Sequence, residues 1–284
     1  MKITFLGTSG ANAYPEAFCS CSNCEQARKL GGKNLRKRSS LLVNDDLLID
    51  LGPDIMSAAQ IHGISFSKVQ YCIQTHPHWD HLDLSHFISR SPILGVMGAP
   101  CLHFYASNET IQRAAETFVR DLWGDSLLSI DLQKSLNMQV QSIQPLQTQA
   151  IGDYLITPFS ANHALTMGAM VYAVKSENRR FFYGTDTGPF FDETWQAFHD
   201  LKMKFDVVIL DHTQGIKEPG VFHMNANQVM DHFTRMRSEG LLNPNARIFA
   251  THIAHDANPV YPELVNYASQ NGYEIAYDGL TLEV

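Results

Sequence analysis

The sequence predicts an α/β fold in which two β-sheets are covered by helices. Short apolar or β-branched runs recur along the chain between Gly, Pro, Asn or Asp residues, a pattern typical of strands. Segments with apolar side chains at helical spacing lie between several of these runs. The chain of 284 residues has no internal repeat and no low-complexity linker, so we expect one domain, residues 1–284, with a substantial core.

Each predicted strand is a short run that can be buried in a sheet. Residues 2–6 form the first strand and enter a glycine turn. The runs that follow are residues 40–43, 47–50, 69–73, 154–158, 170–174, 180–183, 207–210 and 247–250. Strands therefore dominate the start of the chain, and strands mixed with helices follow them.

Helical patterns separate several of these strands. Residues 54–61 lead into a glycine stop, and residues 109–122 follow Ser107, a suitable N-cap. Residues 192–202 and 225–238 each place bulky apolar side chains on one face. We interpret these apolar faces as parts of the core rather than as cofactor sites.

Residues 100–140 interrupt the succession of strands. The stretch shows a helical pattern, and its composition does not change enough to mark a second domain. We therefore predict a helical insertion within the single domain, which forms one wall of a pocket.

Composition limits the partners of the protein. The net charge is −8, and the only basic run, residues 33–38, is short, which argues against nucleic acid as a partner. No segment approaches the roughly 20 apolar residues that span a bilayer. The apolar run in the segment "MKITFLGTSG" is too short for a signal-peptide core, so we expect a cytoplasmic protein. We also expect a small-molecule substrate. A homodimer is compatible with this composition.

The segment "THPHWDH", residues 75–81, directly follows a predicted strand. Alternate side chains of an extended segment point the same way, so His76 and His78 can face one ion. Asp80 and His81 begin a helix and point elsewhere, which lets the same segment serve a second ion such as zinc, manganese or iron. The alternative is a polar loop held by hydrogen bonds.

Further ligand types stand at the ends of later strands. His163 occurs in "FSANHAL", Asp186 in "YGTDTG" and His252 in "FATHIAH". Each residue taken alone is more often an ordinary hydrogen-bonded loop residue. Together they occur in the order that a dinuclear site requires.

These motifs resemble those of the metallo-β-lactamase-fold hydrolases. The resemblance rests on "FLGTSG", "LLIDLGPD", "THPHWDH", His163, "GTDTG" and "ATHIAH", and it covers nearly the whole chain. It implies a four-layer αββα sandwich that holds two divalent ions, manganese or zinc. The implied ligands are His76, His78 and His163 for one ion, Asp80, His81 and His252 for the other, and Asp186 as the bridge.

The cysteine cluster "CSCSNC" contains Cys19, Cys21 and Cys24. It resembles the subgroup with the cyclic phosphodiesterase of the carbon–phosphorus lyase pathway and the quinone-cofactor biosynthesis B protein. The resemblance implies a structural zinc held by these cysteines, with His255 at the family's position for the fourth ligand. His223 is the other candidate for that ligand, and free thiols are the alternative to a zinc site.

The resemblance implies metal-dependent hydrolysis, in which two ions present a metal-bound hydroxide to the substrate. A phosphodiester also needs an acid for its leaving alkoxide. Phosphodiesterase branches of the family place a histidine where His223 stands, paired with a carboxylate at the position of Asp211. We also expect Asp80 to be needed for catalysis.

The predicted substrate is a small cyclic phosphodiester such as a phosphoribosyl cyclic phosphate. Two alternatives remain on the same fold. One is a lactonase or thioesterase, which would use the same metal ligands without needing His223. The other is an accessory protein of quinone-cofactor biosynthesis.

Overall fold

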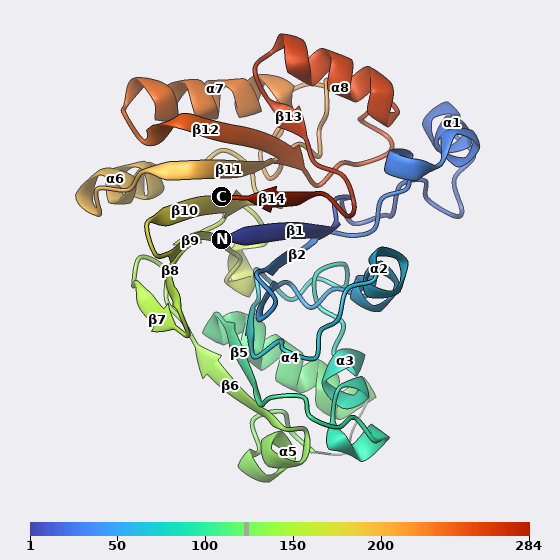
Figure 1. Ribbon diagram of the computed structural model, residues 1–284, viewed down its shortest axis with the longest axis vertical. Coiled ribbons are helices and arrows are strands. Elements are labelled where there is room, and N and C mark those ends of the chain that lie inside the picture. The colour runs from blue at the N-terminus through green and yellow to red at the C-terminus, as the bar shows by residue number, and fades with distance from the viewer. Residues whose placement is uncertain (122–124) are drawn as a thin grey trace.

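The computed structural model describes residues 1–121 and 125–284 and contains two seven-stranded sheets (Figure 1). The first has the order β14-β1-β2-β3-β4-β5-β6. Its strands are β1 (Lys2–Gly7), β2 (Ser40–Val43), β3 (Leu47–Ile49), β4 (Tyr71–Ile73), β5 (Leu102–Ala106), β6 (Met138–Ser142) and β14 (Thr281–Glu283). Pairing is antiparallel from β14 to β3 and parallel from β3 to β6.

The second sheet repeats this mixture of antiparallel and parallel pairs. Its order is β13-β12-β11-β10-β9-β8-β7, antiparallel from β7 to β10 and parallel from β10 to β13. Its strands are β7 (Gln149–Ile151), β8 (Tyr154–Ser160), β9 (Met170–Ser176), β10 (Arg179–Gly184), β11 (Phe205–Asp211), β12 (Leu242–Thr251) and β13 (Glu274–Ile275).

Helices cover the outer face of each sheet. Against the first sheet lie α2 (Ile55–His62), α3 (Ser85–Ser89), α4 (Asn108–Asp121) and α5 (Ile130–Ser135). Against the second lie α6 (Asp192–Asp200), α7 (Ala226–Ser238) and α8 (Tyr261–Gln270). Helix α1 (Ser22–Leu30) begins within the cysteine cluster and contains Cys24. Short 3₁₀ turns occur at η1 (Gly32–Asn34), η2 (Pro92–Leu94) and η3 (Leu165–Met167).

The core consists of a central layer and two outer layers. Phe5 and Leu41 of the first sheet pack with Tyr172 and Phe181 of the second, which places the central layer between the sheets. A cluster around Phe104 and Phe118 joins the first sheet to its helices, and one around Phe182 and Phe198 joins the second to its own. The four-layer αββα arrangement expected from the sequence is therefore confirmed.

The segment 100–140 differs from the prediction. It contains α4 and α5, but β5 lies before these helices and β6 after them, and both strands extend the first sheet in parallel register. The helices therefore connect two strands of the sheet and are not an insertion beside it. The strong amphipathic pattern of α4 obscured the strands on either side. The predicted helix end at Leu122 lies outside the described residues.

The topology brings several loops to one edge of the sandwich. Strands β10, β11 and β12 are mutually parallel, and β8 runs in the same direction as β10 because both are antiparallel to β9. The loops after β8, β10 and β12 therefore leave the second sheet on the same side. Within residues 1–121 and 125–284, no helix combines the length and apolar character needed to cross a membrane.

Candidate metal centres

Asp186 lies at the centre of a cluster of imidazoles. Its Oδ2 atom is 3.1 Å from His76 Nε2, 3.3 Å from His81 Nε2, 3.4 Å from His163 Nε2 and 3.8 Å from His252 Nε2. The side chain is buried, and these contacts hold the pKa of its carboxyl well below the usual value although burial acts in the opposite direction. One carboxylate oxygen thus faces ring nitrogens from several loops.

The ligand-type residues form two groups that share Asp186. The first group contains His76, His78, His163 and Asp186, and the second contains Asp80, His81, His252 and Asp186. In each group the ligand atoms lie within 4.8 Å of one another. Nitrogen and carboxylate oxygen in this number suit zinc or manganese, so each group could hold one divalent ion.

Short contacts between ring nitrogens support this assignment. His78 Nδ1 lies 2.9 Å from His76 Nε2 and 3.3 Å from His163 Nε2, and His81 Nε2 lies 3.3 Å from His252 Nε2. Lone pairs that converge in this way favour a cation between them. The donor set therefore fits the divalent ions that the sequence implies.

Outer contacts orient two of the rings. His81 Nδ1 lies 2.7 Å from Asp50 Oδ2, and His252 Nδ1 lies 2.7 Å from Thr213 Oγ1. Thr213 Oγ1 in turn donates to Asp211 Oδ2 at 2.8 Å. A proton on each Nδ1 leaves the Nε2 lone pair directed at the centre of the cluster, which is the usual arrangement around metal-binding histidines.

Sequence reasoning did not assign Asp50 or Thr213 as supporting residues. Asp50 also accepts hydrogen bonds from Thr75 N and Thr75 Oγ1, both at 2.8 Å, and from Gln74 Nε2 at 2.9 Å. The signal that could have identified Asp50 is its position at the end of the strand in "LLIDLGPD". Thr213 carries no such signal, because its role depends on the approach of two loops.

Replacing Asp50 with asparagine should weaken metal binding at the group that contains His81. Loss of such a supporting contact typically lowers metal affinity about 10- to 100-fold. Asparagine tolerates the left-handed backbone at residue 50, where φ is 68°, so the fold should persist. Competition titration with a chromophoric chelator measures the affinity. Asp45→Asn at an exposed ion pair with Lys2 is the control, and equal affinities in the two variants would contradict the assigned role.

His223 lies beside the same cluster. Its Nδ1 atom is 3.1 Å from Asp186 Oδ1, without hydrogen-bond alignment, and 3.6 Å from Asp211 Oδ2. Burial lowers the pKa of His223, but the neighbouring Asp186 and Asp211 carboxylates outweigh it and raise the pKa to about 10. At neutral pH this raised pKa favours the protonated form of the imidazole at the edge of the cluster.

Asp211 lies near two histidines, His223 and His252, whereas the sequence pattern paired it with His223 alone. This buried residue at the end of β11 lies 3.3 Å from His252 Nδ1 as well as near His223, and it accepts a hydrogen bond from Met224 N at 2.9 Å. Burial raises the pKa of the Asp211 carboxyl, but the contacts with His223 and His252 outweigh burial and hold this pKa below the usual value. Asp211 thus stands between the candidate acid His223 and the candidate ligand His252.

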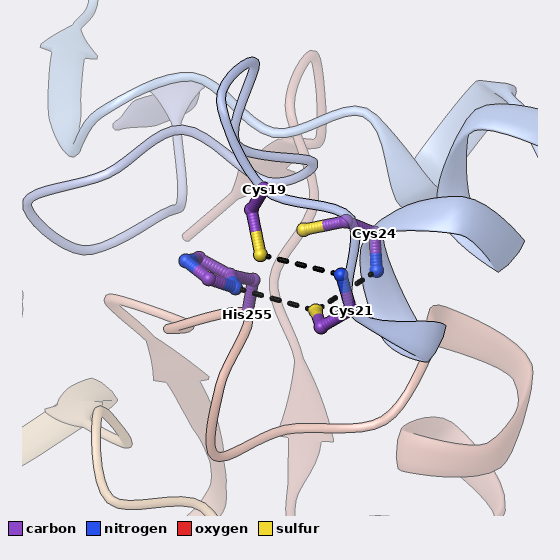
Figure 2. A group of neighbouring side chains, drawn as sticks. All are labelled: Cys19, Cys21, Cys24 and His255. Carbon is purple, nitrogen blue, oxygen red and sulfur yellow. Dashed lines mark hydrogen bonds between the residues drawn. The ribbon is translucent and has the colours of Figure 1, made fainter.

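The cysteines form a separate group with His255. Figure 2 shows Cys19, Cys21, Cys24 and His255 directed toward one another, the cysteines from the loop and first turn of α1 and the histidine from the loop after β12. Cys21 Sγ lies 3.7 Å from His255 Nδ1. The structure therefore places His255 with the cysteines, and His223 with Asp186 and Asp211 instead.

Backbone amides surround the sulfur atoms of this group. Cys21 N donates to Cys19 Sγ, Cys24 N to Cys21 Sγ and Glu16 N to Cys24 Sγ, at 3.4–3.5 Å. Burial opposes ionisation of Cys21, but the Cys24 amide and the neighbouring side chains lower its pKa to about 6, whereas burial raises the pKa of Cys24 to about 12. Amides directed at sulfur support thiolates, so this group fits a zinc ion.

A cavity of about 660 Å³ opens beside the candidate ligands. Its walls include His78, Asp80, His163, Asp186 and His252. The remaining lining residues are Ala11, Asn12, Trp79, Thr213, His223, Ala254, His255 and Asp256. The cavity gives a small molecule access to the histidine and aspartate cluster, with His223 on its wall.

Comparisons with known proteins agree with this architecture. No curated protein sequence matches the chain significantly. Three solved structures align over 100% of the chain. A new diphosphatase from the PhnP family has 20% identity, 97% of its own chain covered and a TM-score of 0.72, and zinc-bound PqqB from Methylobacterium extorquens has 18% identity, 100% covered and a TM-score of 0.73. The short form of human tRNase Z, ELAC1, has 14% identity, 99% of its own chain covered and a TM-score of 0.62. At these identities the likeness concerns the fold.

The family assignment comes from the sequence itself. Residues 46–253 match the model of the beta-lactamase superfamily domain, which spans the "THPHWDH" segment, His163, Asp186 and His252. The fold of this family implies divalent metal ions, and both candidate groups around Asp186 lie within the matched residues or at their edge. The chain therefore belongs to the beta-lactamase superfamily, as a hydrolase of the metallo-β-lactamase fold.

Proposed function

We propose that the protein is a phosphodiesterase that hydrolyses a small cyclic phosphodiester. The observation that carries this proposal is the position of His223, on the wall of the cavity and beside both Asp186 and Asp211. A thioester does not require such a proton donor, because its thiolate leaves without a proton. A phosphodiester with a sugar alkoxide as leaving group does require one.

The proposal assigns two divalent ions, manganese or zinc, to the groups that share Asp186, and one zinc to the cysteine group. When bound, the two ions would supply Lewis acidity toward phosphate oxygens and lower the pKa of water. His76, His78 and His163 would hold one ion, and Asp80, His81 and His252 the other. Asp80 would serve catalysis through the ion that it would hold.

His223 would deliver the proton that the leaving oxygen needs. Its Nδ1 atom faces the carboxylates of Asp186 and Asp211, so Nε2 is the atom left to donate into the cavity. Asp211 would fix the ring, and its own position is fixed by the hydrogen bonds from Thr213 and Met224. The chain thus provides both an orienting carboxylate and a charged donor.

Names of proteins with the same fold support a phosphoester substrate. One neighbour is called a diphosphatase and another a tRNase Z, so this fold accommodates attack at phosphorus. The net charge of −8 and the short basic run 33–38 favour a small phosphodiester over a polynucleotide for this chain. The likeness to PqqB keeps an accessory role in quinone-cofactor biosynthesis as the second candidate.

Replacing His223 with alanine should affect two leaving groups differently. For a cyclic ribose phosphate, which releases an alkoxide, kcat/KM should fall by about 10²- to 10⁴-fold. For bis-p-nitrophenyl phosphate the loss should be less than about 10-fold, because p-nitrophenolate leaves without a proton. Steady-state kinetics with manganese and with zinc measures both. His199→Ala, at an exposed pair with Glu239, is the matched control.

The same assays separate the alternatives. Equal losses on the two leaving groups would exclude His223 as the acid. Turnover of lactones or thioesters without any turnover of phosphodiesters would replace the proposed activity. Absence of turnover on the whole panel by the metal-loaded protein would favour the accessory role.

A further inference from the structure

Trp79 presents an aromatic ring beside the candidate metal ligands. It stands between His78 and Asp80 in the "THPHWDH" segment and is 59% exposed, although large aromatic side chains are usually well covered. Trp79 also lines the cavity that contains those ligands. None of the roles assigned so far uses this side chain.

The tryptophan ring is braced by Arg38. It lines a second cavity, of about 360 Å³, together with Arg38, Pro53 and Pro77. The guanidinium carbon of Arg38 lies 5.6 Å from the centre of the indole ring. Arg38 is itself held by Asp54, with contacts of 2.6 Å and 2.7 Å to the two carboxylate oxygens. A cation over an aromatic ring fixes the ring, and the charge of this cation is already matched by Asp54.

The charge of the cavity wall limits what can lie against this ring. Among the described residues that line the cavity, none is Lys or Arg, and Asp256 adds a carboxylate. Lys217 is not part of this wall, and its charge is paired with Asp256 at 3.1 Å. A substrate with a second phosphate, such as a phosphoribosyl cyclic phosphate, would find no Lys or Arg in the lining of this cavity. Arg38 and Arg113 line the second cavity, and Arg38 is already paired with Asp54. An uncharged flat ring would find Trp79.

We propose that Trp79 is a stacking surface for a nucleobase, and that the substrate is a nucleoside cyclic phosphate. The cyclic phosphate would lie at the groups that share Asp186, and the base would lie on the indole face that Arg38 leaves open. This inference rests on the proposed phosphodiesterase function and narrows its substrate class. Trp79 acts as a specificity residue, because it contacts the base and not the reacting phosphorus.

The first test compares two cyclic phosphodiesters in the metal-loaded protein. Wild-type kcat/KM for 2',3'-cyclic AMP should exceed that for ribose 1,2-cyclic phosphate 5-phosphate by at least about 10-fold, since stacking of one base has this order of effect. In Trp79→Ala this ratio should fall about 10- to 100-fold, and Trp79→Phe should keep most of it. The ratio is internal to each variant, so a general loss of activity in Trp79→Ala does not obscure it.

Met97→Ala is the control for this comparison. Met97 is 93% exposed and does not line the cavity, so the ratio in this variant should equal that of the wild type. An unchanged ratio in Trp79→Ala would overturn the stacking role. Preference of the wild type for the phosphorylated sugar would overturn the substrate class.

A binding experiment separates this inference from the proposed function. Isothermal titration of the manganese-loaded protein with 3'-AMP and with ribose 3-phosphate compares two monophosphates that carry the phosphate at the same ribose oxygen and differ in the base. We expect 3'-AMP to bind at least about 10-fold more tightly, and Trp79→Ala to lose this advantage. Such binding without any phosphodiester turnover would retain the stacking site and overturn the phosphodiesterase function. Phosphodiester turnover with equal binding of the two ligands would retain the function and overturn the stacking site.

Discussion

Replacing Asp186 with asparagine should reduce hydrolysis by more than about 10⁴-fold and lower the metal content of the protein. The Oδ2 atom of Asp186 lies 3.1–3.8 Å from the Nε2 atoms of four histidines, and both ligand groups include this residue. The negative charge that offsets two divalent ions would be lost. Without the ions, water returns to a pKa of about 15.7, which accounts for the size of the expected effect.

The fold should survive this substitution. Residue 186 has a left-handed backbone, with φ of 48°, which asparagine tolerates, and its side chain has nearly the same shape. Circular dichroism checks the fold, elemental analysis counts the ions, and kinetics on the preferred phosphodiester measures activity. Asp192→Asn, at an exposed position of α6, is the control. A variant that keeps both ions and more than a tenth of the activity would exclude Asp186 as the bridge.

The candidate ligands could be predicted because their chemistry is local. His76, His78, Asp80 and His81 lie within one short segment, and Asp186 follows a strand with a clear apolar pattern. Imidazole and carboxylate at the ends of strands therefore indicated a metal site before the strands were arranged. The structure adds that the separate segments meet within hydrogen-bond distances.

The supporting residues depend on contacts between distant segments. Asp50 and His81 are 31 positions apart, and Thr213 and His252 are 39 apart. A single threonine hydroxyl or strand-end carboxylate has too many ordinary roles for its sequence context to reveal such a contact. The proposed stacking role of Trp79 could not be predicted from the sequence either, because the exposure of Trp79 and the position of Arg38 follow only from the fold.

The strands that the sequence did not predict include the short ones at the edges of the second sheet. β7 and β13 have three and two residues, too few for an alternating pattern to be recognised. β5, Leu102–Ala106, has the required apolar side chains, but it directly precedes the strong helical pattern of α4. The central strands were predictable because they are buried on both faces and consist of continuous apolar runs.

Replacing Cys21 with serine should cause the largest loss of stability. Serine oxygen is a poor zinc ligand, so the variant should lose the zinc that we propose at the cysteine group. Cys21 also caps α1, and the loop after β12 that carries His255 is tied to α1 through Asn23, which donates to His255 O at 2.9 Å. Zinc would therefore connect two distant segments, and its binding contributes to the free energy of folding.

The expected loss is on the order of 3–5 kcal/mol, which corresponds to a decrease of about 10 °C in Tm for a protein of this size. This loss should be smaller than the roughly 10–16 kcal/mol that zinc binding contributes to the folding of zinc-finger peptides, because this chain has extensive cores of its own.

Activity per folded molecule should decrease less than stability, since the cysteines do not contact the group around Asp186. Thermal unfolding and zinc analysis measure the change, with Cys101→Ser at a half-buried thiol outside the group as the control. If Cys21→Ser and Cys101→Ser had the same zinc content and the same Tm, the cysteine group would not be a structural zinc site, and the contacts of α1 alone would have to hold the loop.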